Sequence, residues 1–110
     1  MKKQMAEVTI TSENFKQAVL ESEIPVIVDF WASWCGPCRM LAPFVAQLAE
    51  EQAGKIKVGK CNVDEEEMLA VQFGVNSIPT VIAFQGGKEV NRMVGFDARD
   101  PKGGILNLLK

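Results

Sequence analysis

Two cysteines separated by two residues, Cys35 and Cys38, stand where the sequence predicts that a buried strand ends and a helix begins. Residues 25–30, PVIVDF, form an apolar, β-branched run that is typical of a strand buried on both faces. Residues 40–51 carry their apolar side chains at helical spacing. We therefore expect both thiols at the first turn of this helix, and we expect the strand-to-helix junction to organise the fold.

The junction also favours thiol chemistry. Unpaired backbone N–H groups and the positive end of the macrodipole stabilise a thiolate at a helix N-terminus. Cys35 is therefore expected to be the more acidic thiol, and Cys38, on the same face of the first turn, is close enough to form a short disulfide with it. Gly36 and Pro37 fit this turn, because glycine permits close approach and proline is tolerated at the first helical position.

A Cys-x-x-Cys pair can also be half of a zinc site. Zinc would need two further ligands, whereas the chain has no histidine and only one other cysteine, Cys61. A purely structural disulfide is also disfavoured, because so short a loop constrains the unfolded chain little. The residue types therefore favour a redox pair. Cys61 itself is expected to be a small buried hydrophobic residue, with regulatory oxidation as the alternative.

The composition limits the other functions that the chain can have. A length of 110 residues predicts a single domain over residues 1–110, and 47% hydrophobic with 24% charged residues is ordinary for a soluble protein. A net charge of -2 without a basic stripe argues against nucleic-acid binding. Lys2 and Lys3 are not followed by an apolar run, so we expect neither a signal peptide nor a membrane span. Three cysteines, an odd number, fit a reducing compartment better than a secreted domain held by disulfides, so we expect the protein in the cytoplasm.

The order of the predicted elements indicates the fold class. Crossover units come first, and a hairpin through Gly86 and Gly87 with a final helix comes last, so the sequence predicts an α/β protein with a mixed sheet and helices on both faces. Asp64 is the expected cap of a short acidic helix over residues 65–73, and Asp100 with Pro101 is expected to begin the last helix. Strands are predicted at residues 7–10, 25–30, 56–63, 80–84 and 89–94, and a first helix is predicted to be capped within residues 11–14.

The cysteine segment, WASWCGPCRMLAP at residues 31–43, resembles the active-site signature of the thioredoxin family. The resemblance continues through residues 62–64, 74–75, 77–80 and 94–95, and covers nearly the whole chain. It implies a thioredoxin fold: a mixed central sheet of five strands flanked by about four helices on both faces. It also implies a thiol–disulfide oxidoreductase that reduces protein disulfides through a reversible Cys35–Cys38 dithiol.

The same resemblance implies roles for individual residues. Cys35 would be the attacking thiol and Cys38 the resolving one. Asp29 matches the buried acid beneath the disulfide; an unpaired carboxylate between apolar neighbours is costly, and burial should raise its pKa until it can exchange a proton with Cys38. Lys60 matches a lysine near that acid, although a lysine at a solvated strand end is the alternative. Pro79 matches a cis-proline that faces the disulfide.

The resemblance also implies an apolar docking patch around Cys35. Phe96 is bulkier than the small residue common at its position in the family. The expected patch residues are Trp34, Gly36, Pro37, Val75, Ile78, Pro79, Gly95 and Phe96.

The resemblance implies partners as well. The expected partners are protein disulfides and an NADPH-dependent flavoprotein thioredoxin reductase, with no bound cofactor or metal, and we expect a monomer. Two alternative functions stay open. One is an oxidant or isomerase of the same fold, although Pro37 resembles the reducing branch, and the other is a binding subunit without turnover.

Overall fold

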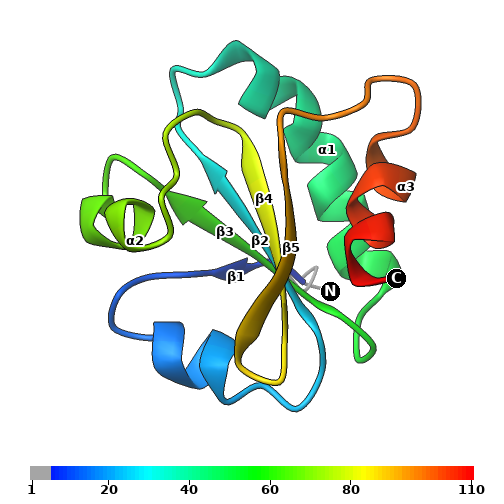
Figure 1. Cartoon of the computed structure of the whole chain (residues 1–110). Helices are drawn as coiled ribbons and strands as arrows, with labels where there is room; N and C mark the ends of the chain where they lie inside the picture. Colours follow the sequence, from blue (N-terminus) through cyan, green and yellow to red (C-terminus); the bar gives the residue numbers. More distant parts are fainter. Residues whose placement is uncertain (1–5) are drawn as a thin grey trace, which may run out of the picture.

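In the computed structural model, which describes residues 6–110, a five-stranded sheet forms the centre of the molecule (Figure 1). Residues 1–5, with the two N-terminal lysines, lie outside the described residues. The strands are β1 (Val8–Thr9), β2 (Val26–Trp31), β3 (Lys57–Asn62), β4 (Thr80–Gln85) and β5 (Lys88–Val94). The helices are α1 (Gly36–Glu51), α2 (Glu67–Gln72) and α3 (Pro101–Leu106), with a π-helical turn η1 (Lys16–Leu20) and a 3-10 turn η2 (Asn107–Leu109).

The sheet has the strand order β1-β3-β2-β4-β5 and is mixed. β1, β3 and β2 are parallel, because η1 and α1 provide the crossovers that connect them. β4 is antiparallel to both β2 and β5. Gly86 and Gly87, with φ of 60° and 79°, form the hairpin turn between β4 and β5. The predicted mixed sheet, with crossovers first and a hairpin last, is confirmed.

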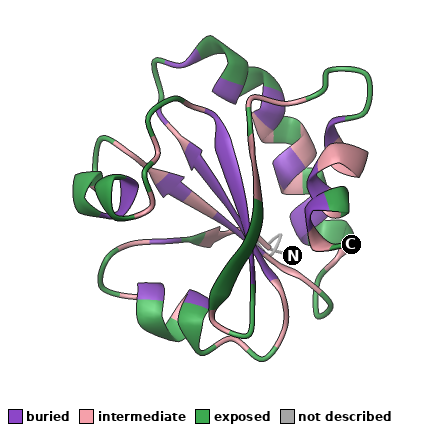
Figure 2. Ribbon diagram, viewed as in Figure 1, coloured by how far each residue is buried: buried purple, intermediate pink, exposed green. Residues whose placement is uncertain are grey.

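The side chains of β2 point alternately into two apolar layers, one on each side of the sheet. Val28 and Phe30 belong to a cluster that includes side chains from η1 and α2, whereas Ile27 belongs to a cluster with α1 and α3. Figure 2 shows the central strands largely buried and the outer surfaces of the helices exposed. Asp29 alternates with Val28 along the strand, so it shares the side of Ile27 and faces the layer of α1.

Of two predicted helix starts, one is confirmed and one is wrong. Thr11 and Asn14 hydrogen-bond each other reciprocally, with Thr11 N–H donating to Asn14 Oδ1 at 2.8 Å and Asn14 N–H donating to Thr11 Oγ1 at 3.2 Å, which caps the segment that leads into η1 at Lys16. Asp64 does not cap α2, which begins at Glu67. Its carboxylate instead accepts a hydrogen bond from the indole of Trp34, so it is engaged elsewhere.

Candidate active site

The two cysteines form a disulfide at the N-terminus of α1. Cys35 is the N-cap residue, Cys38 lies in the first turn, and their Cα atoms are 5.2 Å apart. The backbone N–H of Cys38 donates to Cys35 Sγ at 3.2 Å. Both residues are almost buried, with exposed fractions of 5% and 2%. A backbone donor aimed at the Cys35 sulfur stabilises negative charge there once the bond is reduced, which supports Cys35 as the more acidic thiol.

Trp34, next to the disulfide, is the most prominent exposed side chain of the site, with an exposed fraction of 67%. Its Nε1 donates to Asp64 Oδ2 at 2.8 Å, which fixes the ring at the mouth of the site. Asp64 follows β3 at the same edge at which β2 leads to the cysteines, because the two strands are parallel. Sequence reasoning missed this contact, although the shared carboxyl edge of two parallel strands could have suggested it.

A second segment reaches the disulfide from the start of β4. The Ile78–Pro79 peptide bond is cis, as expected, and the carbonyl oxygen of Ile78 lies 3.7 Å from Cys35 Sγ. The Pro79 carbonyl accepts a hydrogen bond from the N–H of Gly95 at 2.8 Å. The structure therefore brings Ile78, Pro79 and Gly95 together beside Cys35.

An open groove of about 370 Å³ lies alongside this segment, and its walls are mostly apolar. Of the expected patch residues, Trp34, Val75 and Ile78 line the groove, whereas the other five do not. Phe96 packs, partly buried, against the cluster formed by α1 and α3, so it belongs to the core layer rather than to the groove. The residues lining the groove are Trp34, Val63, Val75, Asn76, Ser77 and Ile78; sequence reasoning missed Val63, Asn76 and Ser77.

Asp29 is a buried acid on the α1 side of the sheet. Only 1% of the residue is exposed, and neither carboxylate oxygen has a hydrogen-bond partner. Burial raises its pKa from 3.8 to about 7; the positive charge of Lys60 lowers this pKa and the carboxylate of Glu7 raises it. Lys60 stands opposite Asp29 in the β2–β3 register, with its Nζ 4.3 Å from the centroid of the Trp31 ring. Sequence reasoning missed Glu7, whose Oε2 is also buried without a partner.

Cys61 lies apart from the dithiol and is fully buried with a free thiol. Burial raises the pKa of this thiol to about 12, with further increases from the carboxylates of Glu66 and Asp29. So high a pKa keeps the sulfur protonated, which agrees with the expected role as a small hydrophobic residue.

Among residues 6–110, no group of three or more His, Cys, Asp or Glu side chains is arranged to hold a metal ion. Within the same residues, no helix combines the length and the apolar character needed to cross a bilayer.

The fold and the site together define a thiol–disulfide oxidoreductase. A Cys35–Cys38 pair at a helix N-terminus, with the cis Ile78–Pro79 segment against Cys35 Sγ and an open apolar groove beside it, is consistent with disulfide exchange with another molecule. The thioredoxin family model matches residues 6–107. The chain therefore belongs to the thioredoxin family.

Several curated proteins are similar to the chain over most of its length. Thioredoxin 1 of a Nostoc species is 55% identical over 86 residues, which are 78% of this chain and 80% of that protein. The thioredoxin of Alicyclobacillus acidocaldarius is 48% identical over 95 residues, 86% of this chain and 90% of its own length. An M-type chloroplastic thioredoxin of Chlamydomonas reinhardtii is 48% identical over 86 residues, 78% of this chain and 61% of that protein.

Proposed function

We propose that the protein reduces disulfide bonds of other proteins, with Cys35 as the attacking thiol and Cys38 as the resolving thiol. The observation that carries the proposal is the backbone N–H of Cys38 directed at Cys35 Sγ, at the N-terminus of α1 and beside an open apolar groove. The Cys35 thiolate attacks one sulfur of the substrate disulfide, forms a mixed disulfide, and releases the other sulfur as a thiolate that takes up a proton.

The second step closes the cycle on the protein. Cys38 loses its proton and attacks Cys35 Sγ in the mixed disulfide, which forms the Cys35–Cys38 bond and releases the second substrate thiol. Two electrons have then moved from the dithiol to the substrate. Asp29 would accept the Cys38 proton, because a pKa of about 7 lets this carboxyl take up and return a proton near neutral pH. Lys60 would keep that pKa from rising further, since its charge favours the ionised carboxylate.

The remaining expected site residues would bind the substrate. The groove beside Trp34, Val75 and Ile78 suits an extended apolar segment next to the disulfide. Gly36, Pro37, Pro79 and Gly95 would contact the same segment from around Cys35. An NADPH-dependent flavoprotein thioredoxin reductase in the cytoplasm would return the two electrons, since the dithiol must be restored after each turnover.

Insulin reduction coupled to NADPH and a purified thioredoxin reductase tests the proposal. The wild type should turn over, Cys38→Ser should accumulate a mixed disulfide with the substrate, and Cys35→Ser should form none. Cys61→Ser is the matched control, because the Cys61 thiol is buried and does not line the groove, and it should behave as the wild type. A reduction potential of about -270 mV would fit a reductase, whereas about -120 to -180 mV would indicate an oxidant or isomerase.

A further inference from the structure

The segment of residues 73–79 connects α2 to β4 and provides one wall of the groove. Four of the residues that line the groove, Val75, Asn76, Ser77 and Ile78, come from this segment, which we call the groove loop. Near its C-terminal end, Thr80 Oγ1 donates to the Ser77 carbonyl at 2.6 Å. Pro79 is held there as well, through the backbone hydrogen bond from Gly95. This end of the loop is therefore fixed by its own neighbour at the start of β4 and by Gly95, the residue that follows β5.

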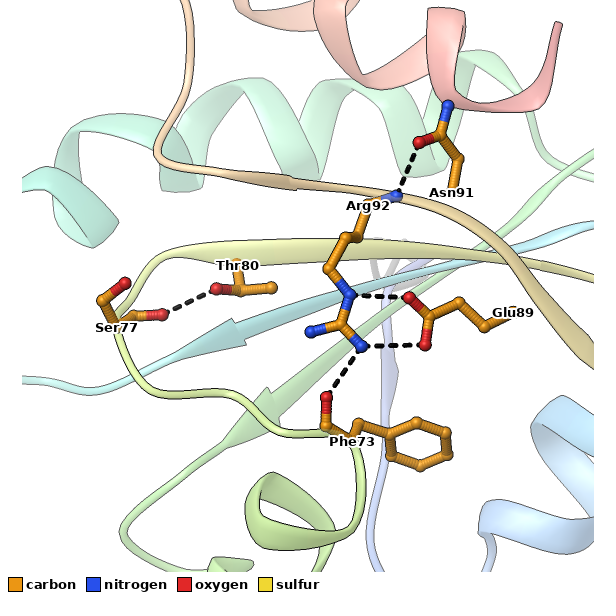
Figure 3. Close-up of polar contacts among 6 residues, drawn as sticks. All are labelled: Phe73, Ser77, Thr80, Glu89, Asn91 and Arg92. Carbon is orange, nitrogen blue, oxygen red and sulfur yellow. Dashed lines mark hydrogen bonds and ion pairs between the residues drawn. The ribbon is translucent and has the colours of Figure 1, made fainter.

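The other end of the groove loop is held by backbone hydrogen bonds to α2, with Val75 N–H donating to the Ala70 carbonyl at 2.8 Å, and also by a side chain from a distant position. Arg92 on β5 donates from Nη2 to the Phe73 carbonyl at 2.7 Å. The same guanidinium donates to both carboxylate oxygens of Glu89, from Nε at 2.6 Å and from Nη2 at 2.8 Å. Figure 3 shows the guanidinium lying between the Glu89 carboxylate and the Phe73 carbonyl. About a third of each of the two charged side chains is exposed, so the pair is partly shielded from water.

The pairing of Glu89 with Arg92 depends on an irregularity in β5. In a regular strand, residues three apart point to opposite faces of the sheet. Here Ala83 pairs with Asn91 but Phe84 pairs with Glu89, so Val90 is an extra residue in the β4–β5 ladder. A bulge of this kind changes the direction of the side chains that follow it. It lets Glu89 and Arg92 meet on the side of the sheet where the groove loop lies.

Phe73 is a suitable point of attachment for such a contact. It is the C-cap of α2, and its ring packs against Phe15 and Phe84 with centroids 5.2 Å and 5.5 Å away. The ring therefore anchors the side chain in the core, while Arg92 holds the carbonyl where the loop begins. The next residue, Gly74, has a φ of 64°, so the chain turns at this point into the groove loop.

We propose that Arg92, oriented by Glu89, is a positioning residue that sets the affinity of the groove for protein disulfides. It touches neither the sulfurs nor the groove itself, and it acts by fixing the start of the groove loop. The inference rests on the proposed reductase function and adds to it a determinant of substrate binding. A small disulfide that reaches Cys35 without occupying the groove does not depend on this residue.

The test compares Arg92→Ala with the wild type on two substrates: insulin, with NADPH and a purified thioredoxin reductase as the electron donor, and a small disulfide, in a single turnover with the pre-reduced protein after removal of the reductant. For insulin, KM should rise about tenfold with kcat unchanged, which corresponds to about 1.4 kcal/mol of binding. For dithiobis(nitrobenzoate), a small disulfide, the rate should be unchanged. Backbone amides of residues 75–77 should exchange faster with solvent in the variant, because the loop has lost one attachment. Arg92→Lys keeps a charged donor for the Phe73 carbonyl but not the fork to Glu89, so its KM should lie between the two.

Arg99→Ala is the matched control. Arg99 pairs with Asp97 on the surface and makes none of the contacts of the groove loop, so this variant should keep the KM of the wild type. An insulin KM that is unchanged in both Arg92 variants would overturn the proposal, as would equal losses with insulin and with the small disulfide. If Arg92→Ala does not fold, the KM and amide exchange of Arg92→Lys decide. A wild type that reduces neither substrate would instead contradict the reductase function.

Discussion

Replacing Asp29 with Asn should make the oxidised protein more stable at pH 8, although it removes the proposed proton acceptor. The carboxyl of Asp29 is buried without a hydrogen-bond partner, and its pKa is raised from 3.8 to about 7. The unfolded chain ionises this group at its ordinary pKa, whereas the folded protein resists ionising it. A raised carboxyl pKa therefore destabilises the fold at every pH above the pKa of the unfolded chain. The loss of stability grows with pH up to the pKa of the folded protein and is constant at higher pH.

The magnitude follows from the size of the shift. A displacement of about three pKa units corresponds to about 4 kcal/mol, because each unit is worth about 1.36 kcal/mol. At pH 4 the penalty should be below about 1 kcal/mol, since the carboxyl is then largely protonated in the folded state and half protonated in the unfolded state. A buried amide without partners has a cost of its own, about 1–3 kcal/mol, but this cost does not change with pH. The stability difference between Asp29→Asn and wild type should thus move in favour of the variant by about 3–4 kcal/mol from pH 4 to pH 8.

Urea unfolding of the oxidised proteins at pH 3, 4, 6 and 8 measures this difference. Asp97→Asn is the opposite control, because Arg99 lowers the pKa of Asp97 and the ionised carboxylate stabilises the fold at neutral pH. That variant should lose stability at pH 8 relative to pH 3. A difference between Asp29→Asn and wild type that does not depend on pH would refute the reasoning. The same variant should release substrate from the mixed disulfide more slowly, since the Cys38 proton has lost its acceptor.

Two further predictions concern charges around Asp29 and the buried thiol. Glu7→Gln should lower the pKa of Asp29 and Lys60→Met should raise it, because the first change removes a neighbouring negative charge and the second a positive one. NMR titration of the Asp29 carboxyl carbon measures both pKa shifts, and shifts of the same sign would contradict this arrangement. Cys61 should resist iodoacetamide at pH 7 while reduced Cys35 is labelled, because burial raises the pKa of the Cys61 thiol to about 12. Mass spectrometry with and without urea measures the labelling of each cysteine, and equal labelling of both in the native protein would contradict the prediction.

The sequence predicted those features that depend on neighbouring residues along the chain. The Cys35–Cys38 pair, the strand before it and the helix after it are contiguous, so local periodicity placed them correctly. The mixed sheet followed from the order of crossovers and hairpin. The cis bond at Pro79 was predicted only through the family resemblance, because an isolated X-Pro bond is cis in only about 5–6% of cases.

Features that depend on register and tertiary contact could not be predicted in this way. In the sequence, nothing distinguishes Arg92 from an ordinary strand residue. Only the bulge at Val90 brings its guanidinium to Glu89. Asp64 has the sequence context of a helix cap, yet the competing Trp34 indole binds its carboxylate. Glu7 comes directly before a two-residue strand, where a carboxylate is expected to be solvated, and nothing nearby in the sequence indicates that one of its oxygens is buried.

The proposed proton acceptor, Asp29, carries two of the buried side-chain oxygens that lack a hydrogen-bond partner in the described part of the chain. Within residues 6–110, the buried side-chain oxygens that lack a hydrogen-bond partner belong to Asp29 and Glu7, and the charge of Glu7 raises the pKa of Asp29. A fold selected for stability alone would pair or remove such groups, because each unsatisfied buried polar atom costs free energy. Burial, with a smaller increase from the charge of Glu7 and a decrease from that of Lys60, instead raises the Asp29 pKa to about 7, where the carboxyl could both accept and return the proton of Cys38 in the proposed mechanism. The cost to stability at Asp29 and its proposed use as an acid therefore have the same physical origin, which is why Asp29→Asn should raise the stability of the fold at pH 8 while it slows the release of substrate by Cys38.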